Sequence, residues 1–274
     1  MTEAQLQRIR DWFLAFVEGF RKESVPLPTA IAVKLEHTRH VAENAREIAR
    51  DLRWTPEDVR LAEALGWLHD VGRFAQFAEY GHLQDATSVD HGLRGLEIVR
   101  ASGILAPMPD HRRGCLLDGI RHHNARTISP AAAPASLPFL KLIRDADKLD
   151  IFRVVLAGIA RDGFQELAGL WPNLALDGPV NPRLQDEIRT HRHGDVAHVH
   201  SLADFLLLEA SWIYDLHYAP TRERVRRDGV LKALAAHLPD DPATRKILDD
   251  LRIFLAGADS FGVARGRKPE QRPC

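Results

Sequence analysis

Apolar residues recur at helical spacing along most of this 274-residue sequence, and this periodicity is the feature that most limits its fold. Near the start, five large apolar side chains follow one another at steps of three or four residues: Leu6, Ile9, Phe13, Phe16 and Phe20. A stripe of this kind covers one face of an α-helix. Alternating runs rich in valine and threonine, which would indicate strands, do not occur in the sequence. The sequence therefore predicts an all-α protein.

Capping residues and periodicity together predict where the helices begin and end. Thr55-Pro56 is typical of an N-cap followed by proline at the first helical position, and we expect the helix that begins there to end near Gly72. The predicted helices cover residues 31–52, 56–72, 88–102, 111–123, 139–156, 202–216, 225–237 and 243–256. The expected regions are an N-terminal helix packing on the core within 1–30, a helical core at 31–157, a helical C-terminal extension at 158–265 and a tail at 266–274.

Charge and cysteine content exclude several classes of protein. Lys and Arg number 37 and Asp and Glu number 38, so the formal net charge is −1 and no basic field exists to gather nucleic acid or an anionic membrane. Two cysteines are too few for a disulfide scaffold. The N-terminus also lacks the basic-then-apolar order of a signal peptide. We expect a soluble cytoplasmic protein without a stable nucleic-acid or membrane partner; the sequence indicates no oligomeric state.

The doublet His69-Asp70 ends a predicted helix that is apolar on most of its circumference. Burying an imidazole and a carboxylate is costly unless hydrogen bonds or a cation compensate. In an isolated pair of this kind, the histidine most often donates to a backbone carbonyl and the aspartate caps a neighbouring helix. The doublet therefore indicates a metal site only if further ligand residues accompany it.

Other histidine and aspartate side chains also fall on apolar helix faces. His37 and Asp147 each have β-branched apolar residues four positions before and after them. Taken singly, His37 is most simply a structural core histidine whose ring nitrogens are hydrogen-bonded. Asp147 alone fits a partner in an internal salt bridge as well as it fits a metal ligand. His91 lies in the first turns of one predicted helix and His123 at the end of the next. Six candidate metal ligands therefore point inward from five helices: His37, His69, Asp70, His91, His123 and Asp147.

These residues resemble the HD superfamily of metal-dependent phosphohydrolases, whose pattern is a histidine, a His-Asp doublet and a distant aspartate. The motifs that carry the resemblance are EHTRHVAENA, LGWLHDVGRF, SVDHGLRG, IRHHNA and IRDADKLDIFR, within about residues 31 to 157. The resemblance implies an all-α HD-domain core, in which His37, the doublet His69-Asp70 and Asp147 match the family's ligands. The further histidines His91 and His123 are similar to those of members with two metals, in which the doublet aspartate bridges the ions. That role would fall to Asp70.

Two cations about 3.5 to 4 Å apart can bind a phosphoryl oxygen, activate water and offset charge on a leaving oxygen. Imidazole and carboxylate ligands suit two ions of Mn, Fe, Co, Ni or Zn, with Mg also compatible. The expected partner is a small phosphorylated substrate, such as a nucleotide, cleaved as a phosphomonoester or phosphodiester. The predicted catalytic residues are Asp70, Lys148 and Arg73, and the predicted substrate contacts, which could equally be ordinary surface charges, are Arg73, Arg126, Arg144 and Lys148.

Departures from better-known branches narrow the expected activity. The pair His122-His123 is followed by Asn124-Ala125-Arg126 rather than the acidic residue and Gly-Tyr-Pro of cyclic-di-GMP phosphodiesterases of the HD-GYP type. Val71-Gly72-Arg73 follows the doublet where alarmone hydrolases carry acidic residues. Two alternatives from other classes stay open: a di-iron oxygenase with much the same ligands, and a regulatory or sensor domain whose metal is structural.

Helical periodicity also chooses between the adjacent histidines. Leu116 and Ile120 lie seven and three residues before His123, which places its imidazole at the end of an apolar stripe. The face that contains His122 is less apolar. We therefore expect His123, and not His122, to be the metal ligand of this pair.

Overall fold

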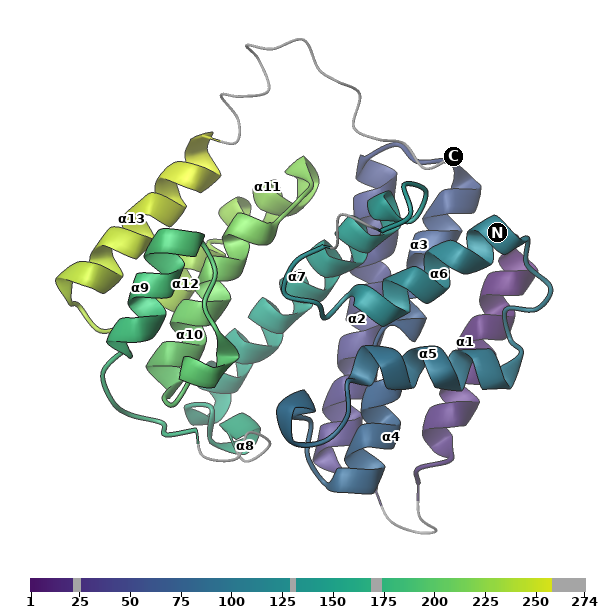
Figure 1. Ribbon diagram of the computed structural model, residues 1–274, viewed down its shortest axis with the longest axis horizontal. Helices are drawn as coiled ribbons and strands as arrows, with labels where there is room; N and C mark the ends of the chain where they lie inside the picture. Colours follow the sequence, from purple (N-terminus) through teal and green to yellow (C-terminus); the bar gives the residue numbers. More distant parts are fainter. Residues whose placement is uncertain (22–25, 129–131, 169–173, 258–274) are drawn as a thin grey trace. The chain divides into compact units, whose positions relative to one another are not determined.

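The computed structural model describes residues 1–21, 26–128, 132–168 and 174–257, and it confirms the all-α class (Figure 1). Of the residues described, 73% are helical. The described residues form no β-strand and only one isolated bridge, between Ala175 and Ser201. Within the same residues, no helix combines the length and the apolar character needed to cross a membrane.

The chain divides into two compact units, and the boundary between Asp150 and Ile151 falls inside α7. The helices of the first unit are α1 (Glu3–Glu18), α2 (Thr29–Asp51), α3 (Pro56–Leu68), α4 (Val71–Tyr80), α5 (His91–Ser102), α6 (Asp110–His122) and the first part of α7 (Leu137–Asp162), with the 3₁₀ helix η1 (Asp85–Thr87) between α4 and α5. The second unit holds the rest of α7 and α8 (Gln165–Ala168), α9 (Pro182–His191), η2 (Val196–His198), α10 (Leu202–Ser211), η3 (Trp212–Asp215), α11 (Ala219–Arg227), α12 (Val230–Ala235) and α13 (Pro242–Gly257).

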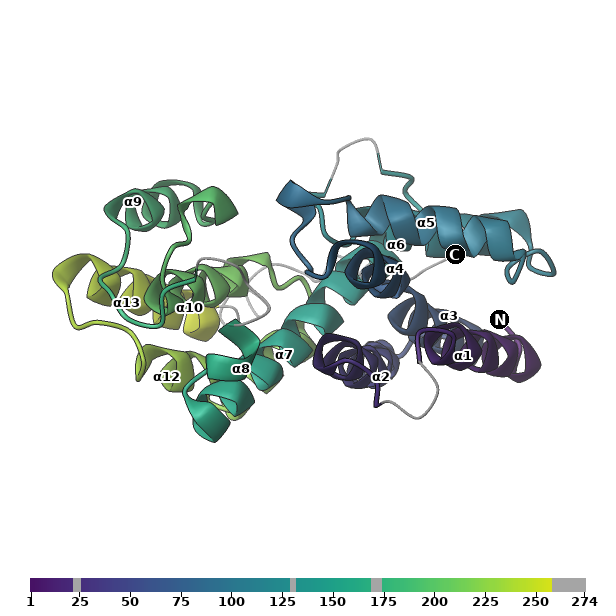
Figure 2. The same cartoon turned by 90° about the horizontal axis from the view of Figure 1, so that it is seen from below.

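In the first unit, α3 packs against both α1 and α2, and Figure 2 shows these three helices along one side of the unit with α5 on the opposite side. Local sequence explains where these helices start. Thr2 and Gln5 form a capping box at the start of α1, and the hydroxyl of Thr55 caps α3 ahead of Pro56. The expected stripe on α1 is buried at Phe13, and α2 buries His37 among its apolar residues. Of the candidate ligands, α2 carries His37, and His69 and Asp70 directly follow α3.

The third predicted helix is wrong at its C-terminal end. We expected one helix to Gly72, but α3 ends at Leu68 and a new helix, α4, begins at Val71. Asp70 has φ −101° and ψ 13°, outside the helical region, and this breaks the helix between the two segments. The apolar pattern continues through the break, so periodicity alone does not reveal it. The break leaves His69 and Asp70 at a sharp corner between α3 and α4.

Helix α5 runs across α4 at very close range (Figure 1). A Cβ atom on Gly72 would lie 2.1 Å from the backbone carbonyl oxygen of His91 and 2.7 Å from the backbone nitrogen of Gly95. A residue with a Cβ atom therefore does not fit at position 72 without displacing α5. This contact sets where the first turn of α5, and with it His91, meets the corner at Asp70.

The second unit is built around α10, which packs against α9, α12 and α13. The sequence did not predict α9, whose amphipathic turns follow an Asn181 cap and Pro182. The helix predicted at 225–237 is wrong as a single element, because Gly229 at φ 65° separates α11 from α12. The predicted tail at 266–274 lies outside the described residues.

Candidate metal centre

The structure brings together all six predicted ligands inside the first unit. They come from separate parts of its chain: α2 carries His37, the corner between α3 and α4 carries the doublet, α5 begins with His91, His123 follows α6, and α7 carries Asp147. The four histidines and Asp70 are each less than 5% exposed. Two overlapping groups of three have their ligand atoms within 4.8 Å of one another: His37, His69 and Asp70, and Asp70, His91 and His123.

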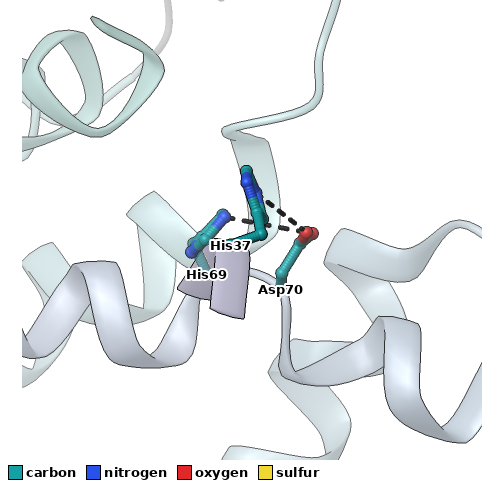
Figure 3. Close-up of side chains that lie close together, drawn as sticks. All are labelled: His37, His69 and Asp70. Carbon is teal, nitrogen blue, oxygen red and sulfur yellow. Dashed lines mark ion pairs between the residues drawn. The ribbon is translucent and has the colours of Figure 1, made fainter. Parts of the chain in front are cut away.

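The first half of the centre contains His37, His69 and Asp147 around one oxygen of Asp70. Nε2 of His37 lies 3.1 Å from Oδ1 of Asp147 and 3.6 Å from Oδ2 of Asp70. Nε2 of His69 lies 3.7 Å from each of the same two oxygens. Figure 3 shows both rings directing a nitrogen toward the Asp70 carboxylate. Two imidazole nitrogens and two carboxylate oxygens therefore converge at this point.

The second half contains His91 and His123 around the other oxygen of Asp70. Nε2 of His91 lies 3.3 Å from Oδ1 of Asp70, and Nε2 of His123 lies 3.4 Å from the same oxygen. The two Nε2 atoms are 3.0 Å apart. Asp70 thus presents Oδ2 to one pair of imidazoles and Oδ1 to another, which is the arrangement of a carboxylate able to bridge two cations.

The outer nitrogen of each imidazole has its own acceptor. Nδ1 of His37 donates to Asp150 at 2.7 Å, and Nδ1 of His91 donates to Asp85 at 2.6 Å. The other two donate to backbone carbonyl oxygens one turn earlier, His69 to Gly66 at 2.8 Å and His123 to Ile120 at 2.9 Å. A proton held on Nδ1 leaves the lone pair on Nε2. All four lone pairs therefore face the space around Asp70, as in metal sites whose histidines are oriented by outer hydrogen bonds.

Several inward-facing atoms are buried without a hydrogen-bond partner. These atoms are Nε2 of His37, Nε2 of His69 and Oδ1 of Asp147. On the other side, the Nε2 atoms of His91 and His123 face each other as two acceptors. Buried acceptors without donors are costly, and a cation placed among them removes that cost. The residues therefore fit divalent metal ions held by nitrogen and oxygen ligands.

Electrostatics keep the two ligand carboxylates ionised. Burial alone would raise the pKa of Asp70, but Lys34 and the surrounding histidines hold that pKa well below its ordinary value. The pKa of Asp147 is likewise well below its ordinary value, because His37 and His69 outweigh the effect of burial. Both side chains are ready to bind a cation at neutral pH.

The pKa values of His91 and His37 are shifted in opposite directions. Burial and the nearby Arg73 lower the pKa of His91 to about 4, so its imidazole is neutral at pH 7 and able to bind a metal ion. Burial and Lys34 act to lower the pKa of His37, but Asp147 and Asp150 outweigh them and raise it above its ordinary value. His37 therefore holds a proton more tightly than a free imidazole does.

A network behind the second half positions Asp85. Arg73 donates to the carbonyl of Leu83 and to Oδ1 of Asp85 at 2.6 Å. Gln76, which is fully buried, donates to Asp85 at 3.0 Å and to Ser88 at 2.8 Å. These bonds tie residues 83–88 to α4 and leave Oδ2 of Asp85 for His91. Arg73, predicted as a catalytic and substrate-binding residue, thus also holds this loop.

The other residues predicted to contact substrate are near His123 or Asp147 in the sequence. Arg144 is buried, and its guanidinium donates to the backbone carbonyls of His123 and Ala125. Lys148 is 8% exposed and donates to the carbonyl of Arg144 at 3.3 Å. Arg126 follows the His123 turn, and its backbone carbonyl also accepts from Arg144 at 3.4 Å. Arg144 therefore secures the segment that carries His123, whereas its contact with substrate stays a prediction.

Three residues of the centre were not found by sequence reasoning. Asp150 lies three residues after Asp147, and Lys34 lies three residues before His37, so helical spacing could have placed both beside known ligands. Asp85 precedes His91 in a short turn and has no periodic signal. Between the adjacent histidines, His123 is 4% exposed and lies in the cluster, whereas His122 is exposed.

Comparison with known proteins identifies this part of the chain. Neither a curated protein nor a solved structure matches the sequence. Residues 35–151 match the family model of the HD domain, and this range includes all six clustered side chains. The part of the chain that is similar to the HD domain, residues 35–151, therefore contains the candidate metal centre.

Proposed function

We propose that this chain is a metal-dependent phosphohydrolase that cleaves a phosphomonoester or phosphodiester of a nucleotide or other small molecule with water activated by two divalent ions. HD domains belong to a superfamily of mostly metal-dependent hydrolases, which supports the general class. One observation carries the proposal: the two oxygens of Asp70 face two separate pairs of imidazole Nε2 atoms.

Each half of the centre would hold one ion. His37, His69, Asp147 and Oδ2 of Asp70 would bind the first, and His91, His123 and Oδ1 of Asp70 the second. Bound there, a pair of divalent ions would polarise a phosphoryl oxygen, lower the pKa of a water and offset charge on the leaving oxygen. A set of imidazole and carboxylate ligands without thiolates suits ions of Mn, Fe, Co, Ni or Zn, and Mg is also compatible.

The chain's own residues would supply orientation and charge. Asp150, Asp85 and two backbone carbonyls hold the four imidazoles in one tautomer, so little reorganisation is needed when the centre is loaded. Burial of the ligands limits the access of bulk water to the reacting atoms. We keep Lys148, Arg73, Arg126 and Arg144 as proposed contacts of the phosphoryl group.

A hydrolysis assay without oxygen tests the proposal. The chain would be loaded anaerobically with Mn²⁺, Co²⁺ or Mg²⁺ and given a panel of phosphomonoesters and phosphodiesters. We expect release of phosphate or of a phosphomonoester without oxygen, since a Lewis-acid mechanism needs no redox change. Asp70→Ala should abolish turnover, whereas Asp249→Ala, at an exposed pair with Arg252, should leave it unchanged.

Two results would contradict the proposal. An absolute requirement for iron and molecular oxygen, with no phosphoester turned over, would favour the di-iron oxygenase. Bound metal with no turnover of any kind, and an unfolding temperature that depends on the metal, would favour a structural or sensing role.

A further inference from the structure

Lys34 is a basic residue at the metal centre that lies outside the predicted ligand and substrate residues. It is on α2, one turn before His37, and its Nζ lies 2.7 Å from Oδ2 of Asp70. The Lys34 side chain is 20% exposed, whereas that of Asp70 is 4% exposed. The ammonium therefore reaches from the surface to a buried ligand carboxylate.

The oxygen that Lys34 contacts is the one needed by the first half of the centre. Oδ2 of Asp70 faces Nε2 of His37 and Nε2 of His69, at 3.6 and 3.7 Å. A divalent ion held by these two imidazoles would share Oδ2 with the ammonium. Like charges on one carboxylate oxygen repel each other strongly where burial limits screening. A divalent ion at this position would therefore weaken the contact between Lys34 and Asp70.

Two other cations beside the centre, Arg73 and Arg144, are held in place by further acceptors, although Nε of Arg73 also lies 3.8 Å from Oδ1 of Asp70. The guanidinium of Arg73 binds the Leu83 carbonyl and Asp85, and that of Arg144 binds backbone carbonyls. Lysine has a flexible four-carbon stem and a compact charge, so Lys34 can swing to a new anion without breaking the fold. An anionic group bound beside the ions would offer a partner of opposite charge for such a movement.

We propose that Lys34 recognises the anionic group of the substrate: when ions load the centre, its ammonium leaves Asp70 and pairs with a phosphoryl oxygen. This inference rests on the proposed phosphohydrolase function and names a specificity. A substrate with a terminal phosphate, which keeps charge beyond that offset by the ions, is favoured over a phosphodiester. In the metal-free protein, Lys34 serves instead as the counter-ion of Asp70.

The test separates metal binding from anion binding in the full-length chain. Mn²⁺ affinity is measured by calorimetry without other anions, and inorganic phosphate affinity is measured on the Mn²⁺-loaded protein. Lys34→Met should bind Mn²⁺ at least as tightly as the unaltered chain, because a competing charge is gone. Its phosphate affinity should fall by about 10- to 100-fold, the range expected for losing a charged hydrogen bond.

Two further variants sharpen the result. Lys34→Arg keeps the charge and should retain part of the phosphate affinity. Arg46→Met removes a cation from the same helix, where Arg46 pairs with exposed Glu43 at 3.0 Å, and should change neither affinity. Phosphate affinity that is unchanged in Lys34→Met would overturn the inference. A loss of Mn²⁺ affinity in that variant would do the same, because it would show a structural role at Asp70.

The outcomes also distinguish this inference from the proposed function. A loaded chain that binds phosphate through Lys34 but hydrolyses no ester would remove the hydrolase proposal and leave the anion site. If the unaltered chain hydrolyses esters and Lys34→Met binds phosphate normally, the hydrolase proposal stands and the role of Lys34 is overturned. Failure of the unaltered chain to take up metal, or of the loaded chain to bind phosphate, would overturn the role of Lys34.

Discussion

Asp150 accepts a buried hydrogen bond from His37, with 2.7 Å between Oδ2 of the carboxylate and Nδ1 of the imidazole. The two residues come from α7 and α2, which are far apart in the sequence. Asp85 makes the equivalent contact with His91 at 2.6 Å. Each half of the candidate metal centre therefore has one histidine oriented by a carboxylate, and this symmetry leads to the first prediction.

Asp150→Asn and Asp85→Asn should each weaken one half of the centre. A carboxylate behind a ligand histidine fixes the tautomer and strengthens the inward nitrogen, and its loss typically costs about 10- to 100-fold in metal affinity. Titration with Co²⁺, followed by absorbance and by metal content, should show two ions in the unaltered chain. Each variant should keep one ion at near-normal affinity.

The two variants are controls for each other, because their helix content should be the same. Loss of both ions in either variant would point to a general structural defect. Retention of two tightly bound ions in both variants would show that neither carboxylate has an orienting role.

His123→Ala should lower bound metal and turnover far more than His122→Ala. Nε2 of His123 lies 3.4 Å from Asp70, whereas His122 is exposed. His123→Ala removes one of the two imidazoles of the second half, so we expect the metal content to fall from two ions toward one. Elemental analysis of both purified variants decides the matter, and the reverse ranking would remove His123 from the centre.

Gly72→Ala should destabilise the first unit and disturb the His91 side of the centre. The added Cβ would lie 2.1 Å from the carbonyl oxygen of His91, which is a backbone atom that can move only with α5. Overpacking of this kind costs about 1–3 kcal/mol. The free energy of unfolding and Co²⁺ affinity are the two measurements.

Gly114→Ala is the matched control for this prediction. Gly114 is in the middle of α6, and no heavy atom lies within 4 Å of a Cβ added there. The substitution should leave metal affinity unchanged and stabilise the helix by up to about 1 kcal/mol. Equal effects at both glycines would contradict the close crossing of α4 and α5.

We expect the buried Glu209 to lower the free energy of unfolding as the pH rises. This residue of α10 is completely buried, neither carboxyl oxygen has a hydrogen-bond partner, and burial raises its pKa well above 4.5. The folded chain therefore keeps a proton that the unfolded chain releases as the pH rises above about 4.5. Between the two pKa values this group lowers the free energy of unfolding by up to about 1.4 kcal/mol per pH unit.

Glu209→Gln should remove that contribution, since the amide cannot ionise. Thermal unfolding of the full chain between pH 5 and 8 should show a flatter pH dependence in this variant. Glu223→Gln, at an exposed pair with Arg226, should keep the slope of the unaltered chain. An identical slope in all three proteins would show that Glu209 does not titrate in this range.

Helix boundaries show which parts of the fold periodicity predicts and which it does not. The helix now seen as α2 was expected within two residues of each end, because its apolar stripe and its flanking residues agree. The break between Leu68 and Val71 was missed, because the apolar pattern runs through it. What ends α3 is the backbone conformation of Asp70, a residue whose carboxylate contacts Lys34 of α2 and His91 of α5.

The sequence by itself determined the all-α class and the residue types of the centre, from His37 to Asp147. Helical periodicity and ligand chemistry are local properties, so they can be read along the chain. Only the tertiary structure decided that Oδ1 and Oδ2 of Asp70 face different histidine pairs. It also decided which atoms of the centre Lys34 and Asp150 contact, because their contacts with Asp70 and His37 join residues 36 and 113 positions apart. Contacts of that separation depend on how the helices pack, and helix periodicity carries no record of it.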